Sequence, residues 1–232
     1  MISNKTLKIF NWVSLTLIPL LFLVFFILYQ IDVNFYKQVT VEDGVIEWPT
    51  FIFIFLSGLG SLYIAIQLKK TKEYFFVFFL LFGIALVLAS FEEISWGQRI
   101  FDVQSPDFFI ENSDQKEINV HNVVQKWGQD ISIFGYMYDF KTKHLVGFCF
   151  FLYGVVCPLL SLNKTFKALF RKCHIVIPPL RLSIGFFLSA VLMLDKPTGK
   201  EEELGEFLFS ICFFIFILGQ YFAIKNNPVS QH

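Results

Sequence analysis

The chain has 232 residues, of which 55% are hydrophobic and 16% are charged, and 32 of them are phenylalanine. Soluble domains carry about 25% charged residues, so this composition excludes an ordinary soluble protein. The 19 basic and 19 acidic residues cancel, which removes the electrostatic case for a nucleic-acid-binding protein. We therefore expect an integral membrane protein that has the lipid bilayer as its partner and binds no nucleic acid.

Six segments of the sequence run for about 17 residues or more with few fixed charges, which is the length that a helix needs to cross a bilayer. In chain order they are residues 9–30, 46–68, 74–91, 143–162, 175–194 and 203–224. They predict an all-α fold, with a single membrane domain over residues 1–232 built as a bundle of six transmembrane helices. The first segment is too long for the apolar part of a signal peptide, so we interpret it as an anchor.

The basic residues predict how these helices are oriented, because cytoplasmic loops carry an excess of Lys and Arg. If both termini are cytoplasmic, the cytoplasmic segments hold eleven basic residues and one acidic residue. The opposite side then holds eight basic and eighteen acidic residues. The sequence therefore predicts a multi-pass protein of the plasma (inner) membrane, with residues 92–138 as a long, partly helical loop on the outer side.

Glu92 and Glu93, which directly follow the third predicted span, are the most unusual charged residues of the sequence. They follow seventeen uncharged residues, so they lie about 26 Å along the third helix, near the outer edge of the hydrocarbon. Acids at a helix C-terminus oppose the helix dipole, so these carboxyls need a partner, either Arg99, a metal ion or a proton. Alternatively, both side chains reach water at an ordinary helix end. Membrane-embedded acids favour the functional interpretation.

Acidic residues also open the sixth predicted span. Thr198 and Glu201 have the spacing of a capping box, which gives Glu201 a structural explanation. Glu203 and Glu206 lie deeper in the segment. Acids in a first helical turn complement the dipole, so an ordinary helix start and a site inside the bundle both stay open for these two residues.

Three more polar residues lie near the outer ends of the spans. Glu47 precedes the second span, and the helix dipole alone can explain it. Glu117 and His121 are four residues apart in the outer loop, so they would share one face of a helix, although a lone histidine is more often structural than a ligand. If these groups converge with the other acids, carboxylates and one imidazole would suit Mg²⁺, Mn²⁺ or Zn²⁺. The candidate ligands of this divalent metal ion are Glu92, Glu93, His121 and Glu206.

These residues predict a membrane hydrolase or transferase that acts on a lipid-linked or polar substrate. Glu93 and His121 are the catalytic candidates, with His121 as the base, and a metal ion would activate water or polarise a phosphoryl or acyl group. The candidate substrate-binding residues are Trp96, Gln98, Arg99 and Asn122, and the supporting residues are Glu47, Glu117 and Glu203. Two alternatives stay open. One is a proton- or cation-coupled transporter, and the other is a non-catalytic membrane partner or sensor subunit.

Three polar motifs lie between residues 42 and 122, a region that makes up about a third of the chain. The run Glu-Glu-Ile-Ser-Trp-Gly-Gln-Arg occupies residues 92–99, Asn-x-x-Gln-x-Glu-x-Asn-x-His-Asn occupies residues 112–122, and Asp-Gly-x-x-Glu-Trp occupies residues 43–48. In this combination the chain resembles a family of bacterial multi-pass membrane proteins of unassigned function. The resemblance implies that the polar outer-face residues belong together, and it does not imply a particular activity.

Overall fold

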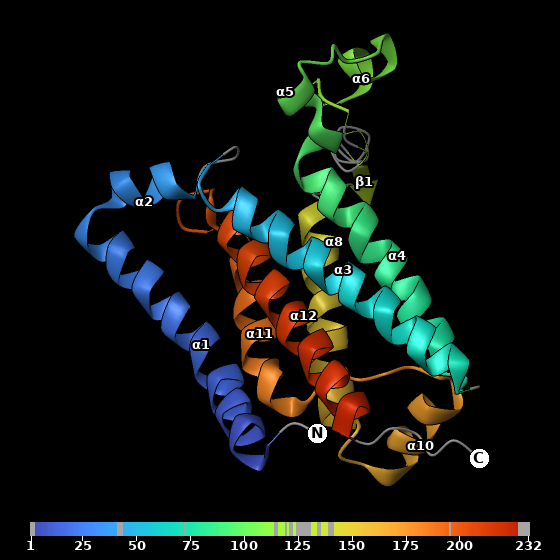
Figure 1. The fold of residues 1–232 in the computed structure, drawn as a ribbon. Helices are drawn as coiled ribbons and strands as arrows, with labels where there is room; N and C mark the ends of the chain where they lie inside the picture. The colour runs from blue at the N-terminus through green and yellow to red at the C-terminus, as the bar shows by residue number, and fades with distance from the viewer. Residues whose placement is uncertain are drawn as a thin grey trace.

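A computed structural model describes residues 3–40, 44–71, 73–113, 116–118, 120, 123, 131–133, 136–138, 142–194 and 196–226. Of Arg99 and of residues 131–133, 136–138 and 142–143 it describes the backbone only. Four of the described helices are long and apolar enough to cross a membrane. They are α1 (Asn4–Ile31), α3 (Glu47–Lys70), α4 (Phe76–Glu93) and α12 (Glu201–Asn226) (Figure 1). The chain is therefore a helical, membrane-embedded protein, as its composition predicts.

The other two predicted spans form shorter and less regular helices. Residues 143–162 contain α8 (Thr142–Phe151), the π-helical turn η2 (Leu152–Val156) and α9 (Cys157–Leu160). Residues 175–194 contain the 3₁₀ turn η3 (Leu180–Leu182) and α11 (Ser183–Leu192). Helix begins late in this second segment because Pro178 and Pro179 lack an N–H group and disfavour helix in the residue before them. The apolar helix Leu180–Leu192 rises only about 20 Å.

Short elements connect these helices. They are α2 (Val33–Val39), the 3₁₀ turn η1 (Ser95–Gly97), α5 (Gln98–Phe101), α6 (Asp107–Asn112) and α10 (Lys164–Lys172). Strands β1 (Ile131–Ile133) and β2 (Tyr136–Tyr138) pair in an antiparallel hairpin. The all-α prediction holds for the bundle and did not include this hairpin.

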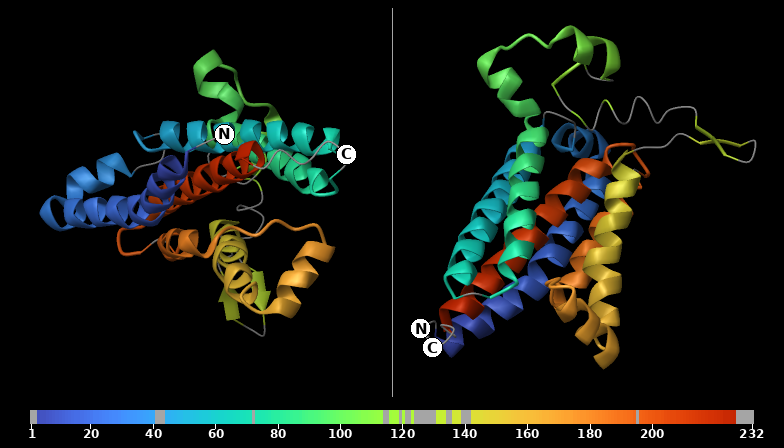
Figure 2. Two further views of the ribbon diagram at one scale, coloured as in Figure 1. Left: turned by 60° about the horizontal axis from the view of Figure 1, so that its bottom comes forward. Right: turned by 90° about the vertical axis from the view of Figure 1, so that its right-hand side faces the viewer.

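Helix α12 is the centre of the bundle. In its most apolar stretch 50% of the residues are buried, against 11% in α1, which therefore lies at the edge. Figure 2 shows α12 between the α3–α4 pair and the α8–α11 group. A Cβ atom on Gly60 of α3 would lie 2.8 Å from Ile217 of α12, and one on Gly185 of α11 would lie 2.7 Å from Cys212 of α12. Small residues thus allow the close helix contacts that are common in membrane proteins.

Two side-chain hydrogen bonds align the helices that carry the acidic residues. Ser61 Oγ of α3 donates to the carbonyl oxygen of Phe79 in α4 at 2.7 Å. Ser189 Oγ of α11 donates to the carbonyl oxygen of Gly205 in α12 at 2.5 Å. Helices α3 and α4 are antiparallel, so the start of α3 and the end of α4 lie at one end of the bundle, where α12 also starts (Figure 1).

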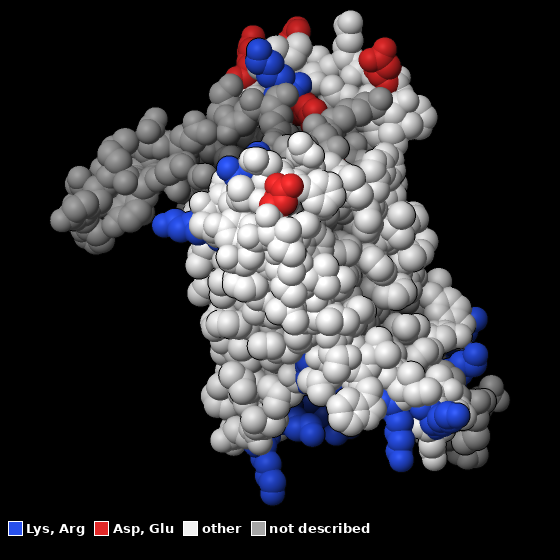
Figure 3. Space-filling view, turned by 90° about the vertical axis from the view of Figure 1, so that its left-hand side faces the viewer, with Lys and Arg blue, Asp and Glu red and all other residues white. Residues whose placement is uncertain are grey.

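Charged side chains gather at the two ends of the bundle and leave a largely uncharged belt between them (Figure 3). The end where α1 begins and α12 ends is termed the basic end. Its residues include Lys5, Lys8, Lys69, Lys70, Lys164, Lys167, Arg171, Lys172 and Lys225. The opposite end is termed the acidic end. Its residues include Glu47, Glu92, Glu93, Glu117, Glu201, Glu202, Glu203 and Glu206. The belt exposes large apolar side chains such as Leu81, which suits contact with lipid.

Candidate functional site

Two glutamates from helices far apart in the sequence meet at the acidic end. Glu93 is the last residue of α4, and Glu206 lies in the second turn of α12. Their two carboxyl groups lie within hydrogen-bonding range of each other, and both side chains are partly buried. We refer to these two residues as the Glu93–Glu206 pair. The pair connects α4 with α12, and the hydrogen bonds of the bundle core align these two helices at this end.

Further acids surround the Glu93–Glu206 pair. The charges of Glu47 and Glu92 act on the Glu93 carboxyl and repel it when it is ionised. Glu47 is the first residue of α3, where the helix dipole favours an acid. Glu203 lies one turn before Glu206 in α12 and is also partly buried. The structure therefore brings together acids at the ends of three of the predicted spans.

A tight turn follows α4 and folds the outer chain back over the helix end. Ser95, Trp96 and Gly97 all have left-handed backbone angles, with φ of 45°, 57° and 75°. For a residue other than glycine such a conformation costs about 1–3 kcal/mol. The contacts of Trp96 offset this cost, because its Nε1 donates to Glu92 Oε1 at 2.7 Å and its ring stacks on Phe91 at 5.7 Å.

Side chains of the segment 92–99 hold a second stretch of the outer loop. Glu92 Oε2 accepts a hydrogen bond from the backbone N–H of Val120 at 2.8 Å. Gln98 Oε1 accepts from the N–H of Ile118 at 2.8 Å, and Gln98 Nε2 donates to Ser105 Oγ at 2.7 Å. Residues 116–118 and 120 are thus fixed against the turn that follows α4, close to the Glu93–Glu206 pair. We refer to this arrangement as the loop clamp.

Several residues that were predicted from the sequence lie in or beside the loop clamp. Trp96 and Gln98, predicted to bind substrate, make contacts within the loop. Glu117, predicted to be supporting, accepts a hydrogen bond from Ser95 Oγ at 2.5 Å. Ser95 was not among the predicted residues, although its place inside the Glu-Glu-Ile-Ser-Trp-Gly-Gln-Arg run is the signal that could have indicated it. His121, Asn122 and the side chain of Arg99 lie outside the described residues.

Glu201 anchors the start of α12. Its carboxylate accepts hydrogen bonds from the backbone N–H groups of Thr198 and Gly199 at 3.0 Å and of Lys200 at 3.3 Å. The hydroxyl of Thr198 also donates to it at 2.6 Å. The predicted contact between Thr198 and Glu201 is present, but α12 begins at Glu201 itself. This buried carboxylate fixes the helix start one and a half turns before Glu206.

A metal site is incomplete in the part of the chain that the structure describes. Among those residues no group of three or more His, Cys, Asp or Glu side chains lies close enough to hold a metal ion. The Glu93–Glu206 pair supplies two carboxylates. The expected imidazole ligand, His121, lies outside the described residues.

Comparison with protein-family models, with curated proteins and with solved structures gives no match. The fold defines a helical membrane protein with several helices of bilayer length. Its function therefore has to be argued from the acidic end itself.

Proposed function

We propose that the protein crosses the plasma membrane six times, with the basic end in the cytoplasm and the acidic end outside. The excess of basic residues at the end that holds the first and last described residues supports this orientation. It places the Glu93–Glu206 pair and the loop clamp on the extracytoplasmic side. It also makes residues 92–138 an outer loop, as the charge pattern predicts.

The shorter helices fit this topology because extended chain adds to their length. Residues 175–179, which precede η3, are not helical and can reach about 16 Å. Together with the helix that follows, these residues are longer than the thickness of the bilayer core, which is about 30 Å. Non-helical backbone at that depth must be bonded within the protein. Tyr153 supplies such a bond, since its hydroxyl donates to the carbonyl oxygen of Val176 at 2.7 Å.

We further propose that the protein is a membrane hydrolase or transferase and that the Glu93–Glu206 pair is its catalytic unit. The observation that carries this proposal is that the two carboxyl groups lie within hydrogen-bonding range of each other. Two carboxyls come within this range when they share one proton, because two ionised carboxylates at contact distance repel each other. A pair that holds one proton contains both an acid and a base.

The chemistry follows from that protonation state. The ionised carboxylate takes a proton from a water molecule or a substrate hydroxyl, whose oxygen then attacks an acyl or phosphoryl centre. The protonated carboxyl gives its proton to the leaving oxygen, so the pair again holds one proton after each turnover. His121 is the proposed additional base, and Arg99 and Asn122 are the proposed contacts to a polar or anionic head group. The loop clamp gives Trp96 and Gln98 the role of positioning this loop.

A divalent metal ion is the other proposed occupant of the pair. It would displace the shared proton, bind both carboxylates and require His121 as a third ligand. Metal analysis of the purified protein tests this form. Bound Mg²⁺, Mn²⁺ or Zn²⁺ that is lost in Glu93→Gln would support it, whereas metal-free active protein would leave the proton-sharing form.

The described core favours site chemistry over transport. Three of the buried hydroxyls between the two ends, those of Ser57, Ser61 and Ser210, each donate to a backbone carbonyl. A carrier needs polar groups that exchange partners along a path through the membrane. Among the described residues, these hydroxyls are instead tied to the helix backbones.

Amide substitutions test the catalytic proposal. Glu93→Gln and Glu206→Gln keep the shape of the pair but remove the group that exchanges a proton, so we expect hydrolysis of lipid-linked phosphate or acyl substrates in vesicles to fall about 100-fold or more. Glu202→Gln is the matched control, because Glu202 lies on the same helix and is also partly buried. Equal activity in all three variants would contradict the proposal.

A further inference from the structure

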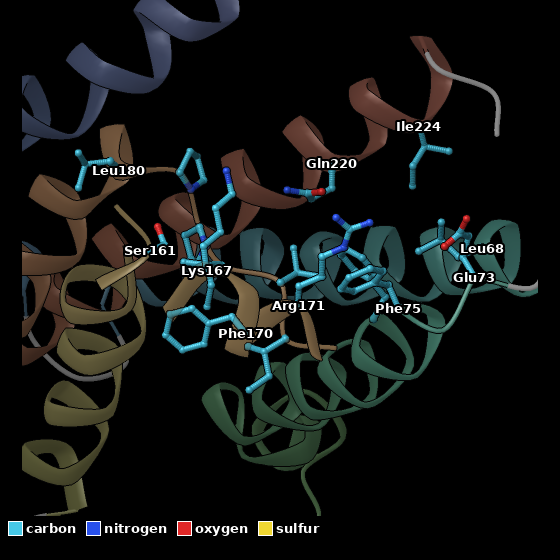
Figure 4. Close-up of a pocket in the computed structure, with 16 residues that line it drawn as sticks. Leu68, Glu73, Phe75, Ser161, Lys167, Phe170, Arg171, Leu180, Gln220 and Ile224 are labelled. Carbon is cyan, nitrogen blue, oxygen red and sulfur yellow. The ribbon is translucent and has the colours of Figure 1, made fainter. Parts of the chain in front are cut away.

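A hollow of about 510 Å³ opens at the basic end, far from the Glu93–Glu206 pair. Its walls come from α10, from residues 175–180, and from the parts of α3, α4 and α12 nearest to them (Figure 4). We refer to it as the α10 pocket. Nothing in the chemistry proposed for the acidic end uses it.

Most of the wall of the α10 pocket is apolar. Phe75, which directly precedes α4, Phe79 of α4, Phe170 of α10 and Pro178 line it, and of these Phe79 and Pro178 are buried. The wall therefore offers a surface that an alkyl chain would cover and that water wets poorly. A small polar solute would leave this part of the wall without a partner.

Two cations lie at the edge of this apolar wall. Lys167 and Arg171 are one turn apart on α10 and are exposed. Figure 4 shows both side chains extending from α10 toward Gln220 of α12. Within the described residues, neither cation forms an ion pair or a side-chain hydrogen bond. Glu73 also lines the pocket, beside Leu68 at the other end of the wall (Figure 4).

Helix α10 has the pattern of a helix that lies at a membrane surface. Its apolar residues Phe166, Leu169 and Phe170 are three and four positions apart, which places them on one face. Phe166 and Leu169 are exposed, at 40% and 49%, so this face has little cover from the protein. Basic residues on the opposite face and apolar residues toward the acyl boundary are typical of interfacial helices.

We propose that the α10 pocket binds an anionic phospholipid. Lys167 and Arg171 hold the headgroup phosphate, and an acyl chain lies along the wall formed by Phe75, Phe79 and Pro178. Basic pockets between membrane helices on the cytoplasmic side recognise anionic headgroups in this way. Charge complementarity favours a phosphate over a zwitterionic or cationic group, and the apolar wall favours a lipid over a soluble phosphate.

Native mass spectrometry of the full chain in detergent tests this proposal, with phosphatidylglycerol and phosphatidylcholine added in turn. We expect the wild-type protein to bind phosphatidylglycerol more tightly. The double variant Lys167→Gln with Arg171→Gln loses about tenfold or more of that preference, since each charge near the surface contributes about 1 kcal/mol. The matched control is Lys164→Gln with Lys172→Gln, which removes the same charge from α10 at positions that do not line the pocket.

Further measurements separate the pocket from general attraction to a basic surface. Equal losses in the two double variants, or no loss in either, would overturn the proposal. Glu73→Gln should strengthen phosphatidylglycerol binding, because it removes a negative charge from the wall, and weaker binding would count against the site. Soluble glycerol phosphate should not displace the lipid, since it leaves the apolar wall uncovered, and effective displacement would also overturn the proposal. An unchanged unfolding temperature shows that each variant is folded.

Discussion

The two ends of the molecule use their charges in different ways. At the acidic end, the carboxyls of Glu92, Glu117 and Glu201 accept hydrogen bonds from backbone or side-chain donors, and Glu93 lies within hydrogen-bonding range of Glu206. At the basic end, Lys167 and Arg171 extend from an exposed helix without an ion pair among the described residues. Internal bonds fix the geometry that chemistry needs, whereas unpaired cations remain available to an external anion. This difference is the basis of the two proposals, chemistry at the acidic end and lipid binding at the basic end.

The largest expected effect comes from separating α3 from α4, which would dismantle the acidic end. A Cβ atom on Gly83 would lie 2.8 Å from Leu62 Cγ and 3.0 Å from the carbonyl oxygen of Gly58. Gly83→Leu therefore overpacks this contact, and we expect a loss of about 3 kcal/mol in the free energy of unfolding. Ala85→Leu, at an exposed position of the same helix, is the control. Unfolding in micelles measures both, and equal stabilities would contradict the close packing of this pair.

A smaller effect should follow from releasing the loop clamp alone. Glu92→Ala removes the acceptor of the Trp96 and Val120 hydrogen bonds, and a bond to a charged group contributes about 1.5–3 kcal/mol. We expect the Val120 amide to exchange hydrogen about tenfold faster. Gln98→Ala should instead accelerate exchange at Ile118. If either variant left its own amide protected, the hydrogen bonds of the loop clamp would be refuted.

Salt should distinguish the two ends without any substitution. Raising ionic strength from 0.1 M to 1 M shortens the screening length from about 10 Å to about 3 Å. We expect the preference for phosphatidylglycerol at the exposed basic end to fall severalfold. The partly buried Glu93–Glu206 pair should not change. A lipid preference that is insensitive to salt would argue against Lys167 and Arg171 as its source.

The smallest effect concerns the belt between the ends. Ser61→Ala removes a hydrogen bond from α3 to α4, and such interhelical bonds contribute about 0.6 kcal/mol in membranes. Ser57→Ala is the control, because Ser57 Oγ donates to Phe53 within its own helix at 2.5 Å. Unfolding measurements should show the larger loss for Ser61→Ala. The reverse order would show that this bond does not hold the pair together.

Sequence patterns predicted the bilayer-length helices well because length and lack of charge are local properties. The limits of α1, α3, α4 and α12 lie within a few residues of the predicted spans. The segment 175–194 was harder, since Pro178 and Pro179 shorten its helix without interrupting its apolar character. A prediction based only on length and lack of charge does not register this effect of proline.

The sequence predicted which residue types form the candidate site better than it predicted their contacts. Unfavourable acids at the end of α4 indicated Glu93, and in the structure Glu206 lies within hydrogen-bonding range of it. The same pattern could not show that Trp96 and Gln98 contact the loop, because those contacts depend on three consecutive left-handed residues after α4. The spacing of residues along the chain does not show that the backbone reverses its direction after α4.

Infrared difference spectroscopy of the protein in lipid tests the central claim most directly. A shared proton gives a carbonyl band of a protonated carboxyl group, and we predict its loss in both Glu93→Gln and Glu206→Gln, since the new amide can donate to the remaining carboxylate. Glu202→Gln should keep the band. A band that persists in both pair variants, or that is absent from the wild-type protein, would contradict proton sharing at the acidic end.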